Sequence, residues 1–574
     1  MIFRTNKYYL LILLASFIVG GCGDFSGNYD EIESSISSES TTTTTDTTTT
    51  DNTTDTTAPT VSSISPIDNK SWIALSDNIS VTFSESMDTT SVTTNTSNTS
   101  CSGSLQLSSD NFSGCVQMSS SPSSSNSDKT FTVDPAGNLS NSTTYKIRVT
   151  TGVKDSSGNT LSSQYETSSG FTTKGWTQQL GSSSDESVWG VTVDSSDNIY
   201  VTGYTKGGLD GNTSSGNNDL FLVKYNSSGT KQWTKQLGTS SDDYGYGVSV
   251  DSSDNIYVTG YTKGGLDGNT SSESNDFFLV KYNSSGTKQW TQQLGTSSSD
   301  VGIGVTADYS NNIYVTGYTG GGLDGNTSSG NNDIFLVKYN SSGIKQWTQQ
   351  LGTSSSDIVN GVTVDSSNNI YVTGYTGGGL DNNTSSGGYD IFLVKYNSSG
   401  TKQWTKQLGT SSSDHGQGVI VDSSDNIYVT GYTGGGLDGN TNSGEDDIIL
   451  VKYNSSGTKQ WTQQLGTSSG DLGFGVTADS SNNIYVTGYT WGGLDGNTSS
   501  YGMDIFLVKY NSSGTKQWTQ QLGTSSVDRG QGVTVDSSDY IYVTGYTGGG
   551  LEGNTNSGLS DIFLLKFNSS GVLQ

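Results

Sequence analysis

A single 57-residue unit occurs seven times without interruption and fills the C-terminal two-thirds of the chain. Each copy begins at a tryptophan, and the spacing shows no insertion or deletion. These tryptophans are Trp176, Trp233, Trp290, Trp347, Trp404, Trp461 and Trp518. A fixed period of this length indicates a repeat architecture, in which each unit buries its apolar faces against its neighbours.

Each unit contains four short segments typical of β-strands, separated by turns rich in Asn, Asp, Ser and Gly. In the first unit they are residues 176–180, 190–193, 199–204 and 220–225, and they carry the Val, Ile, Tyr and Trp that favour strands. Four antiparallel strands per repeat are typical of a propeller blade. The sequence therefore predicts an all-β fold with a seven-bladed β-propeller over residues 175–574. An open solenoid competes with it, but solenoids need atypical capping repeats, and the sequence has none.

The two ends of the repeat region complement each other. A Thr-Lys-Gln-Trp-Thr strand, with Ile344 in place of the first Thr in one copy, follows the inner units, whereas the last unit stops at Gln574 without one. An equivalent strand at 174–180 precedes the first unit. We expect this strand to complete the last four-stranded blade and close the ring, which removes an exposed sheet edge.

The repeats also resemble the bacterial β-propeller repeat family, which is typified by Asn-Ile-Tyr-Val-Thr-Gly and Phe-Leu-Val-Lys-Tyr. The resemblance covers residues 176–574 and recurs in seven copies. It implies the propeller fold but names no ligand.

Residues 58–174 have a different character, because all four prolines of the chain lie there. Alternating runs such as 79–83 and 145–149 predict a β-sandwich. The segment resembles the bacterial Ig-like family in Val81-Thr82-Phe83-Ser84-Glu85-Ser86-Met87-Asp88, in residues 135–139 followed by Thr144-Tyr145, and in residues 153–159 before the closing 171–173. The resemblance implies a spacer or adhesive module without a catalytic motif. The Ser-rich insertion at 101–127 departs from the family pattern.

The first 57 residues are predicted to be targeting and linking segments. Arg4 and Lys7 precede an apolar run at 8–19 that is too short to span a bilayer, so residues 1–21 read as a signal peptide. Val19-Gly20-Gly21-Cys22 resembles the lipobox of bacterial lipoproteins, which implies lipid attachment at Cys22. The alternative is an ordinary secretory signal with a coincidental cysteine. Residues 22–57 form a Ser/Thr-rich segment that cannot bury a core and is expected to be a disordered tether.

The lipobox resemblance implies a lipoprotein of the bacterial cell envelope, at the outer membrane, facing either the periplasm or the medium. An exported chain meets an oxidising compartment, so a disulfide between Cys101 and Cys115 is expected, with two free thiols as the alternative. The net charge of −28 argues against nucleic acid as a partner. We expect a monomer that contacts the membrane through its lipid anchor, and no motif for a cofactor is present.

The seven copies differ at three places, and this variation suggests a binding surface. The first follows a recurring acid, the second opens the long loop between the second and third strands, and the third ends that loop. Strand direction predicts that all three places lie in loops on one face of the disc. The candidate ligand-binding residues there are the aromatics that anchor interfaces. They are Trp189, Tyr244, Tyr246, Phe474, Trp491 and Tyr501. Neutral drift at positions released from packing is the alternative.

The recurring acids have two interpretations. They either cap a turn by accepting backbone N–H bonds or line the channel mouth and hold a cation. The acids are Glu186, Asp243, Asp300, Asp357, Asp414, Asp471 and Asp528. Asp-Gly-Asn triplets such as 210–212 offer oxygen ligands for calcium but lack the spacing of a known calcium loop. The sequence thus commits to no metal site.

Enzyme chemistry has little support in the sequence. The single histidine, His415, lies in a variable place of one unit, and no phosphate-binding loop opens a helix. We therefore expect a non-enzymatic envelope protein whose variable face binds a protein or glycan, or mediates adhesion. A structural or assembly role is the first alternative, and a polysaccharide-active propeller enzyme is the second.

Overall fold

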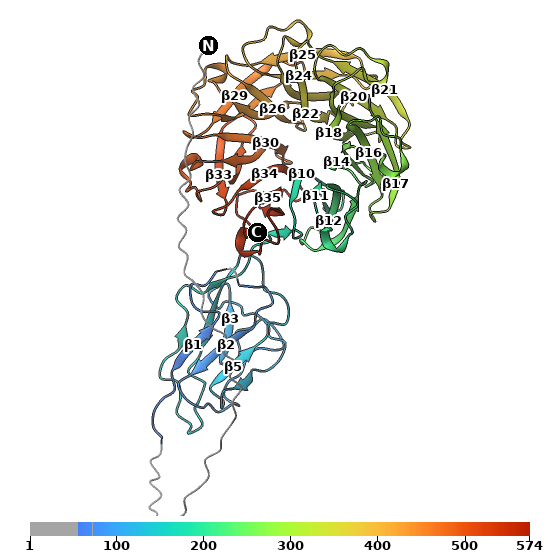
Figure 1. Ribbon diagram of the computed structural model, residues 1–574. Coiled ribbons are helices and arrows are strands. Elements are labelled where there is room, and N and C mark those ends of the chain that lie inside the picture. Colours follow the sequence, from blue (N-terminus) through green and yellow to red (C-terminus); the bar gives the residue numbers. More distant parts are fainter. Residues whose placement is uncertain (1–54, 72) are drawn as a thin grey trace, which may run out of the picture. The chain divides into compact units, whose positions relative to one another are not determined.

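The computed structural model describes residues 55–71 and 73–574. Cys22, the predicted signal peptide and nearly all of the predicted tether lie outside the described residues. Within them, no helix has the length and apolar character needed to cross a membrane. The described chain is an Ig-like β-sandwich followed by a β-propeller (Figure 1).

The Ig-like region consists of two sheets that enclose one apolar core. One sheet has the order β1-β2-β5-β4, and in the other β3, β6 and β7 follow one another while β8 also pairs with β6. Val81, Ile147 and Val149 are fully buried between the sheets. The strands are β1 (Val61–Ser65), β2 (Ile79–Phe83), β3 (Leu105–Ser108), β4 (Ser123–Ser125), β5 (Thr130–Val133), β6 (Thr144–Val149), β7 (Tyr165–Glu166) and β8 (Phe171–Thr172).

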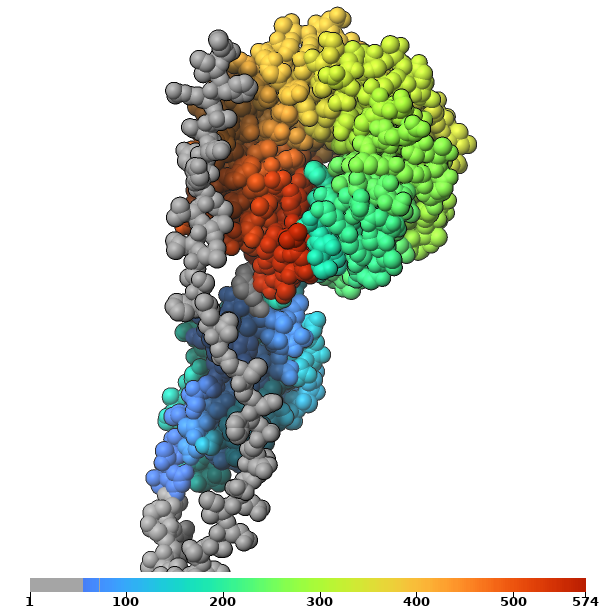
Figure 2. Space-filling model, viewed as in Figure 1, coloured from blue at the N-terminus to red at the C-terminus, as the bar shows by residue number. Residues whose placement is uncertain are grey.

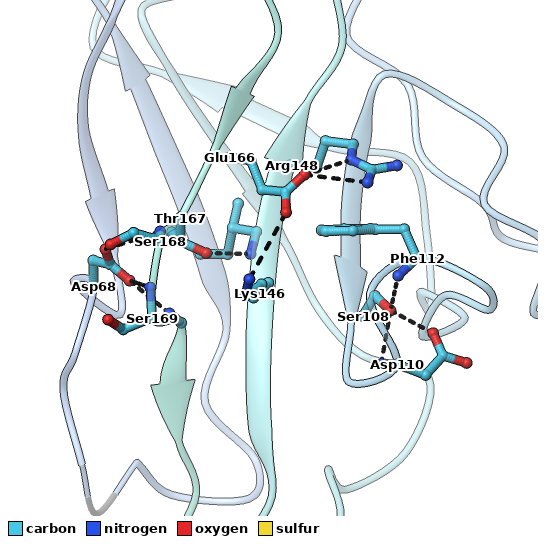
Figure 3. Close-up of polar contacts among 12 residues, drawn as sticks. Asp68, Ser108, Asp110, Phe112, Lys146, Arg148, Glu166, Thr167, Ser168 and Ser169 are labelled. Carbon is cyan, nitrogen blue, oxygen red and sulfur yellow. Dashed lines mark hydrogen bonds and ion pairs between the residues drawn. The ribbon is translucent and has the colours of Figure 1, made fainter.

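The Ser-rich insertion, whose pairing the family pattern left undefined, supplies β3 to one sheet and β4 to the other. The expected disulfide between Cys101 and Cys115 is confirmed, with the two Cα atoms 4.9 Å apart. Polar contacts fix the sheet that contains β6 (Figure 3). Arg148 donates to Glu166 at 3.2 Å and lies over the Phe112 ring at 3.5 Å.

The propeller contains seven four-stranded antiparallel sheets arranged around a central channel (Figure 1). The first strand of each blade lies nearest the channel. These strands are β10 (Glu186–Val193), β14 (Asp243–Val250), β18 (Asp300–Ala307), β22 (Asp357–Val364), β26 (Asp414–Val421), β30 (Asp471–Ala478) and β34 (Asp528–Val535).

The second and third strands are buried on both faces, which explains their nearly continuous apolar sequence. The second strands are β11 (Ile199–Thr205), β15 (Ile256–Thr262), β19 (Ile313–Thr319), β23 (Ile370–Thr376), β27 (Ile427–Thr433), β31 (Ile484–Thr490) and β35 (Ile541–Thr547). The third strands are β12 (Asp219–Tyr225), β16 (Asp276–Tyr282), β20 (Asp333–Tyr339), β24 (Asp390–Tyr396), β28 (Asp447–Tyr453), β32 (Asp504–Tyr510) and β36 (Asp561–Phe567).

The fourth strands form the rim, and a short 3-10 turn lies in each long loop. The fourth strands are β13 (Lys231–Leu237), β17 (Lys288–Leu294), β21 (Lys345–Leu351), β25 (Lys402–Leu408), β29 (Lys459–Leu465), β33 (Lys516–Leu522) and, for the last blade, β9 (Gln178–Leu180). The 3-10 turns are η1 (Leu209–Gly211), η2 (Leu266–Gly268), η3 (Leu323–Gly325), η4 (Leu380–Asn382), η5 (Leu437–Gly439), η6 (Leu494–Gly496) and η7 (Leu551–Gly553).

The ring closes as the sequence predicts. Strand β9 pairs with β36 of the last blade, and Trp176 packs edge-on against Tyr542 with ring centroids 5.4 Å apart. In Figure 2 the C-terminal blade, in red, lies directly against the first blade, in teal. The sheet edge that the last blade would otherwise expose is thus covered by a strand from the other end of the propeller.

The propeller has two unlike faces. We call the face that carries the two short turns of each blade the turn face, and the face that carries the long loops and the crossovers between blades the loop face. On the turn face, hydrogen bonds join each blade to the next. Ser195 donates to Asp254 at 2.9 Å, and Ser537 of the last blade donates back to Asp197 at 2.8 Å. These bonds close the same circle that β9 closes at the rim.

Candidate functional site

A β-bulge occurs in the channel-lining strand of every blade. In β10 the register with β11 shifts between Val188 and Gly190, so that Trp189 is left without a paired residue. The same shift occurs in the other six blades. The seven bulged residues are Trp189, Tyr246, Ile303, Asn360, Gln417, Phe474 and Gln531. A bulge re-aims a side chain without disrupting the rest of the sheet.

All seven bulged residues line one cavity of about 420 Å³ in the central channel. The rest of its lining is a glycine and a valine from each blade, such as Gly190 and Val191. These glycines are needed because a Cβ at Gly190 would lie 2.8 Å from the carbonyl oxygen of Tyr246 in the next blade. The channel therefore has a constant small-residue wall and one variable residue per blade.

A ring of tyrosines lies beside the cavity on the loop face, near the end of each second strand. Sequence comparison of the copies missed this ring, because the tyrosine does not vary. The sequence signal that could have found the ring is a tyrosine, an aromatic residue with a polar hydroxyl group, directly after the glycine of every second strand. The structure buries this side chain at least in part. The ring consists of Tyr204, Tyr261, Tyr318, Tyr375, Tyr432, Tyr489 and Tyr546. Burial raises the pKa of Tyr204 and of its six equivalents.

The second residue of the first strand inserts between neighbouring ring tyrosines in three blades. Tyr244 lies 4.4 Å from Tyr204 and 4.8 Å from Tyr261, measured between ring centroids. His415 lies 4.2 Å from Tyr375 and 4.7 Å from Tyr432. Arg529 places its guanidinium carbon 4.7 Å from the Tyr489 ring and 5.8 Å from the Tyr546 ring. Planar groups thus fill these gaps.

Two of the three variable places contact each other across blade boundaries. The amide of Asn218, at the end of the long loop, donates to the Tyr244 hydroxyl of the next blade at 2.8 Å. Tyr389 packs against His415, and Arg529 donates to the sulfur of Met503 at 3.0 Å. Some of the variation therefore belongs to inter-blade packing.

The structure corrects the predicted placement of the first variable place. It was expected in a crossover loop, but Trp189, Tyr244, Tyr246 and Phe474 lie within the channel-lining strands, which begin four residues earlier than predicted. The reason is that the preceding acid already pairs with the second strand, as Glu186 does with Thr205. These residues therefore lie on the fixed first strands rather than in flexible loops, and Trp189, Tyr246 and Phe474 line the channel.

The six candidate aromatics form two clusters and one isolated residue. Tyr246 contacts both Trp189 and Tyr244, with ring centroids 5.3 and 6.4 Å apart. Phe474 and Trp491 both contact Tyr489, at 5.4 and 5.1 Å. Tyr501 is 99% exposed and, among the described residues, packs against no other aromatic ring.

The recurring acids are buried and cap the turn before the first strand. Asp243 accepts hydrogen bonds from the backbone N–H of Thr239 at 2.6 Å and from its hydroxyl at 2.9 Å. Burial raises the pKa of Asp243, and these hydrogen bonds partly oppose the rise. None of the seven acids lines the channel cavity. The turn-capping interpretation is therefore confirmed.

The Asp-Gly-Asn triplets have a structural explanation as well. Asp210 adopts a left-handed backbone conformation in η1, pairs with Lys231 and accepts a hydrogen bond from Thr234 at 2.8 Å. Its carboxylate thus fastens the long loop to the rim strand of the same blade. In the last blade Glu552 takes this place, and no described lysine or arginine pairs with it.

Comparison with known proteins assigns both regions. Residues 55–173 match the Bacterial Ig-like domain family. Seven segments match the Beta-propeller repeat family. They are residues 175–210, 232–267, 289–324, 346–381, 403–438, 460–495 and 517–552.

Similar curated proteins include an uncharacterized WD repeat-containing protein of Acanthamoeba polyphaga mimivirus, which is 26% identical over 495 residues. The regulatory protein FlaEY of Caulobacter vibrioides is 24% identical over 407 residues. These alignments cover 64% and 62% of this chain but only 36% and 42% of the relatives. The chain therefore matches less than half the length of either relative.

Two similar solved structures share only low sequence identity with this chain. A catalytically inactive virginiamycin B lyase from Staphylococcus aureus is 12% identical, with a TM-score of 0.39, over 68% of this chain and 98% of that one. An ulvan lyase is 11% identical, with a TM-score of 0.41, over 69% of this chain and 97% of that one. The repeat matches and the observed sheets agree, and the chain belongs to the β-propeller repeat family, with a bacterial Ig-like domain before its seven blades.

Proposed function

We propose that this protein is a non-catalytic receptor that binds a glycan chain at the loop-face end of its central channel. The observation that carries the proposal is the bulge in every first strand, which places the variable residue of each blade in one cavity. Residues that vary over a rigid scaffold and converge on a concave site are typical of ligand recognition.

The cavity chemistry fits a hydroxyl-rich ligand with apolar faces. Trp189, Tyr246 and Phe474 supply flat aromatic surfaces, against which the C–H faces of a sugar ring can pack. Asn360, Gln417 and Gln531 supply amide groups, each of which both donates and accepts hydrogen bonds. A lining that combines aromatic rings with amides suits the C–H faces and hydroxyl groups of a sugar.

The same lining favours binding over catalysis. It contains no carboxylate and no histidine, which are the usual general acids and bases. Tyr246 is its one titratable group, and burial raises its pKa, which disfavours the phenolate that a base would need. Burial also lowers the pKa of His415 to about 4, and this side chain is held between two tyrosines.

The proposed location is the bacterial cell envelope. The lipobox-like sequence ending at Cys22 supports a lipid anchor, and the following Thr-rich segment supports a tether. Together with the Ig-like domain as a spacer, they would hold a monomeric propeller away from the membrane. Labelling the cells with a radioactive fatty acid tests this part, because Cys22→Ser should abolish incorporation into the protein.

A glycan array tests the binding function. The wild-type chain should bind a defined set of glycans, and Trp189→Ala/Tyr246→Ala/Phe474→Ala should lose at least tenfold in affinity, because it removes all three aromatic surfaces. The matched control is Tyr309→Ala, which removes an aromatic side chain that is 72% exposed on the turn face. This control should bind like the wild type.

The array also separates the competing functions. Release of shorter products from a bound glycan would make the protein an enzyme. Absence of any glycan ligand would reject the proposal and favour a structural role. Equal binding by the triple variant and the wild type would move the site away from the channel.

A further inference from the structure

Arg529 differs from every other described cation on the loop face. It lies two residues before the bulged Gln531, which lines the cavity. Lys206 pairs with Asp185 at 2.6 Å and Lys263 with Asp242 at 2.7 Å. Among the described residues, no carboxylate forms an ion pair with Arg529.

The aromatic ring holds the Arg529 side chain in place. The guanidinium carbon lies between the Tyr489 and Tyr546 rings, and Nε donates to the Met503 sulfur. A guanidinium has five N–H donors in a rigid plane. Burial raises the pKa of Tyr489 and of Tyr546, and the positive charge of Arg529 partly opposes that rise. The group is therefore fixed in orientation, and no acid among the described residues forms an ion pair that would neutralise its charge.

The cation lies next to the aromatic part of the binding cavity. Tyr489, which contacts Arg529, stacks on Phe474 with the ring planes 21° apart, and Phe474 lines the channel. On its other side Tyr489 meets Trp491, which is 42% exposed. A sugar lying on Phe474 or Trp491 would bring its substituents close to the guanidinium.

The acids around this place do not compete for Arg529. Asp528, the neighbouring residue, is buried and accepts two hydrogen bonds from Thr524. Asp446 interacts electrostatically with Tyr489, and burial followed by the charge of Glu445 raises the pKa of Asp446. Among the described residues, neither Asp528 nor Asp446 forms an ion pair with Arg529.

We propose that the channel mouth recognises an anionic sugar, with Arg529 as the group that binds its carboxylate or sulfate. This inference rests on the glycan-binding function proposed above and narrows its ligand class. A planar guanidinium matches the geometry of such an oxyanion and can form two parallel hydrogen bonds to it. The fixed stacking between tyrosines lowers the entropy lost when the ligand binds.

Calorimetric titration of the full-length chain tests the inference with three hexasaccharides. The probes are a galacturonate oligomer, a sulfated galactan oligomer and neutral cellohexaose. We expect one of the anionic oligomers to bind at least tenfold more tightly than cellohexaose, because charged hydrogen bonds are stronger than neutral ones. Arg529→Gln should weaken that oligomer about 10- to 100-fold and leave cellohexaose affinity unchanged. The two anionic arms distinguish carboxylate from sulfate.

Two further variants test whether misfolding, rather than loss of the anion contact, explains the weaker affinity of Arg529→Gln. Arg529→Lys keeps the charge but loses the planar fork, and should retain an intermediate affinity. Lys263→Gln removes a paired lysine from the same face and should bind all probes like the wild type. Near-ultraviolet circular dichroism, which reports the packed tyrosines, should be alike in all variants.

The outcomes separate this inference from the broader function. If Arg529→Gln binds the anionic oligomers within twofold of the wild type while the triple aromatic variant still loses binding, the anion site is wrong and the glycan receptor stands. If neither anionic oligomer binds better than cellohexaose, the anion site is also wrong. If no probe binds and the array finds no other glycan, the receptor function fails with it.

Discussion

On the turn face, the aspartate that begins the turn between the first and second strands accepts hydrogen bonds from equivalent positions in blade after blade. On the loop face, by contrast, the bulged residue that lines the channel varies among the blades. Asp194 accepts hydrogen bonds from Ser196, Asn198 and Tyr200. Burial tends to raise the pKa of Asp194, but these hydrogen bonds outweigh it and lower the pKa. Every acceptor position there is used, so substitution is costly.

The loop face shows the opposite arrangement. Its bulged residues meet a cavity on one side, so Trp, Tyr, Ile, Asn, Gln and Phe all fit at equivalent positions. Blade-to-blade stability and variation of the channel lining therefore depend on different residues of the same scaffold. Hydrogen bonds on the turn face hold the blades together, and the bulges on the loop face leave the channel free to vary.

Trp176→Ala tests the side-chain packing on the turn face at the point where the ring closes. Trp176 is only 4% exposed and packs against Tyr542 and Gly229. Its loss should lower the free energy of unfolding by about 3–5 kcal/mol, because a large buried ring is removed. Denaturant titration measures this loss. Hydrogen exchange should rise most in β36, since no covalent turn joins β36 to β9. The matched control is Trp347→Ala, whose strand is covalently joined to its neighbour, and a larger exchange effect there would contradict the account.

Asp365→Ala tests a single turn within the ring. Asp365 accepts hydrogen bonds from Ser367 at 2.9 Å, from Asn369 at 2.8 Å and from the Tyr371 hydroxyl at 2.9 Å. Removing the carboxylate leaves buried donors unpaired and should cost about 2–4 kcal/mol of unfolding free energy. Glycan affinity should not change. The loop-face control, Gln417→Ala, should alter the unfolding free energy by less than about 1 kcal/mol. Equal destabilisation by both variants would remove the distinction between the faces.

The partly buried carboxyl group of Glu552 in the last blade should make the stability of the folded protein depend on pH. Burial raises the pKa of Glu552 to about 7, from an ordinary value of 4.5. Between these values the folded protein binds more protons than the unfolded chain, so its stability should fall as the pH rises from about 5 to 7. Glu552→Gln cannot ionise and should lack this contribution. The measurement is the difference in urea midpoint between variant and wild type at pH 5 and pH 8, which cancels the contributions of His415 and the other buried acids. A difference that does not depend on pH would contradict the prediction.

Tyr501→Ser should have the smallest effect. This side chain is almost fully exposed and belongs to neither aromatic cluster. Its replacement should leave the thermal midpoint unchanged and alter glycan affinity by less than about threefold, since an isolated residue at the edge of a binding site contributes little to the affinity. A tenfold loss of affinity would extend the site from the channel out to the loop tips.

Much of the fold followed from the sequence because identical repeats restrict the arrangement. The number of blades, their four strands and a closing strand were all predicted from the period and the turn residues, and the structure confirms them. The closing strand is shorter than the predicted 174–180, because only Gln178–Leu180 pair with β36. The disulfide followed from having two cysteines in a domain that was expected to be exported. These features depend on local patterns that repeat or on simple counts.

The candidate site was predicted only in part. Variation pointed to Trp189, Tyr246 and Phe474, but no local signal showed that these residues are bulged into the channel. A bulge arises when two strands of unequal residue count pair, and this depends on the partner strand. The tyrosine ring was missed because a residue that does not vary between repeats looks like a residue of the packed core. Arg529 could be interpreted only once the structure had placed Tyr489 and Tyr546 around it.

The most direct test of the central claim is a crystal structure of the full-length chain soaked with hexagalacturonate and, separately, with cellohexaose. The account predicts that sugar density lies at the loop-face end of the channel, against Trp189, Tyr246 or Phe474. Sugar density on the turn face beside Tyr309, or an empty channel at a concentration that saturates binding in solution, would contradict it.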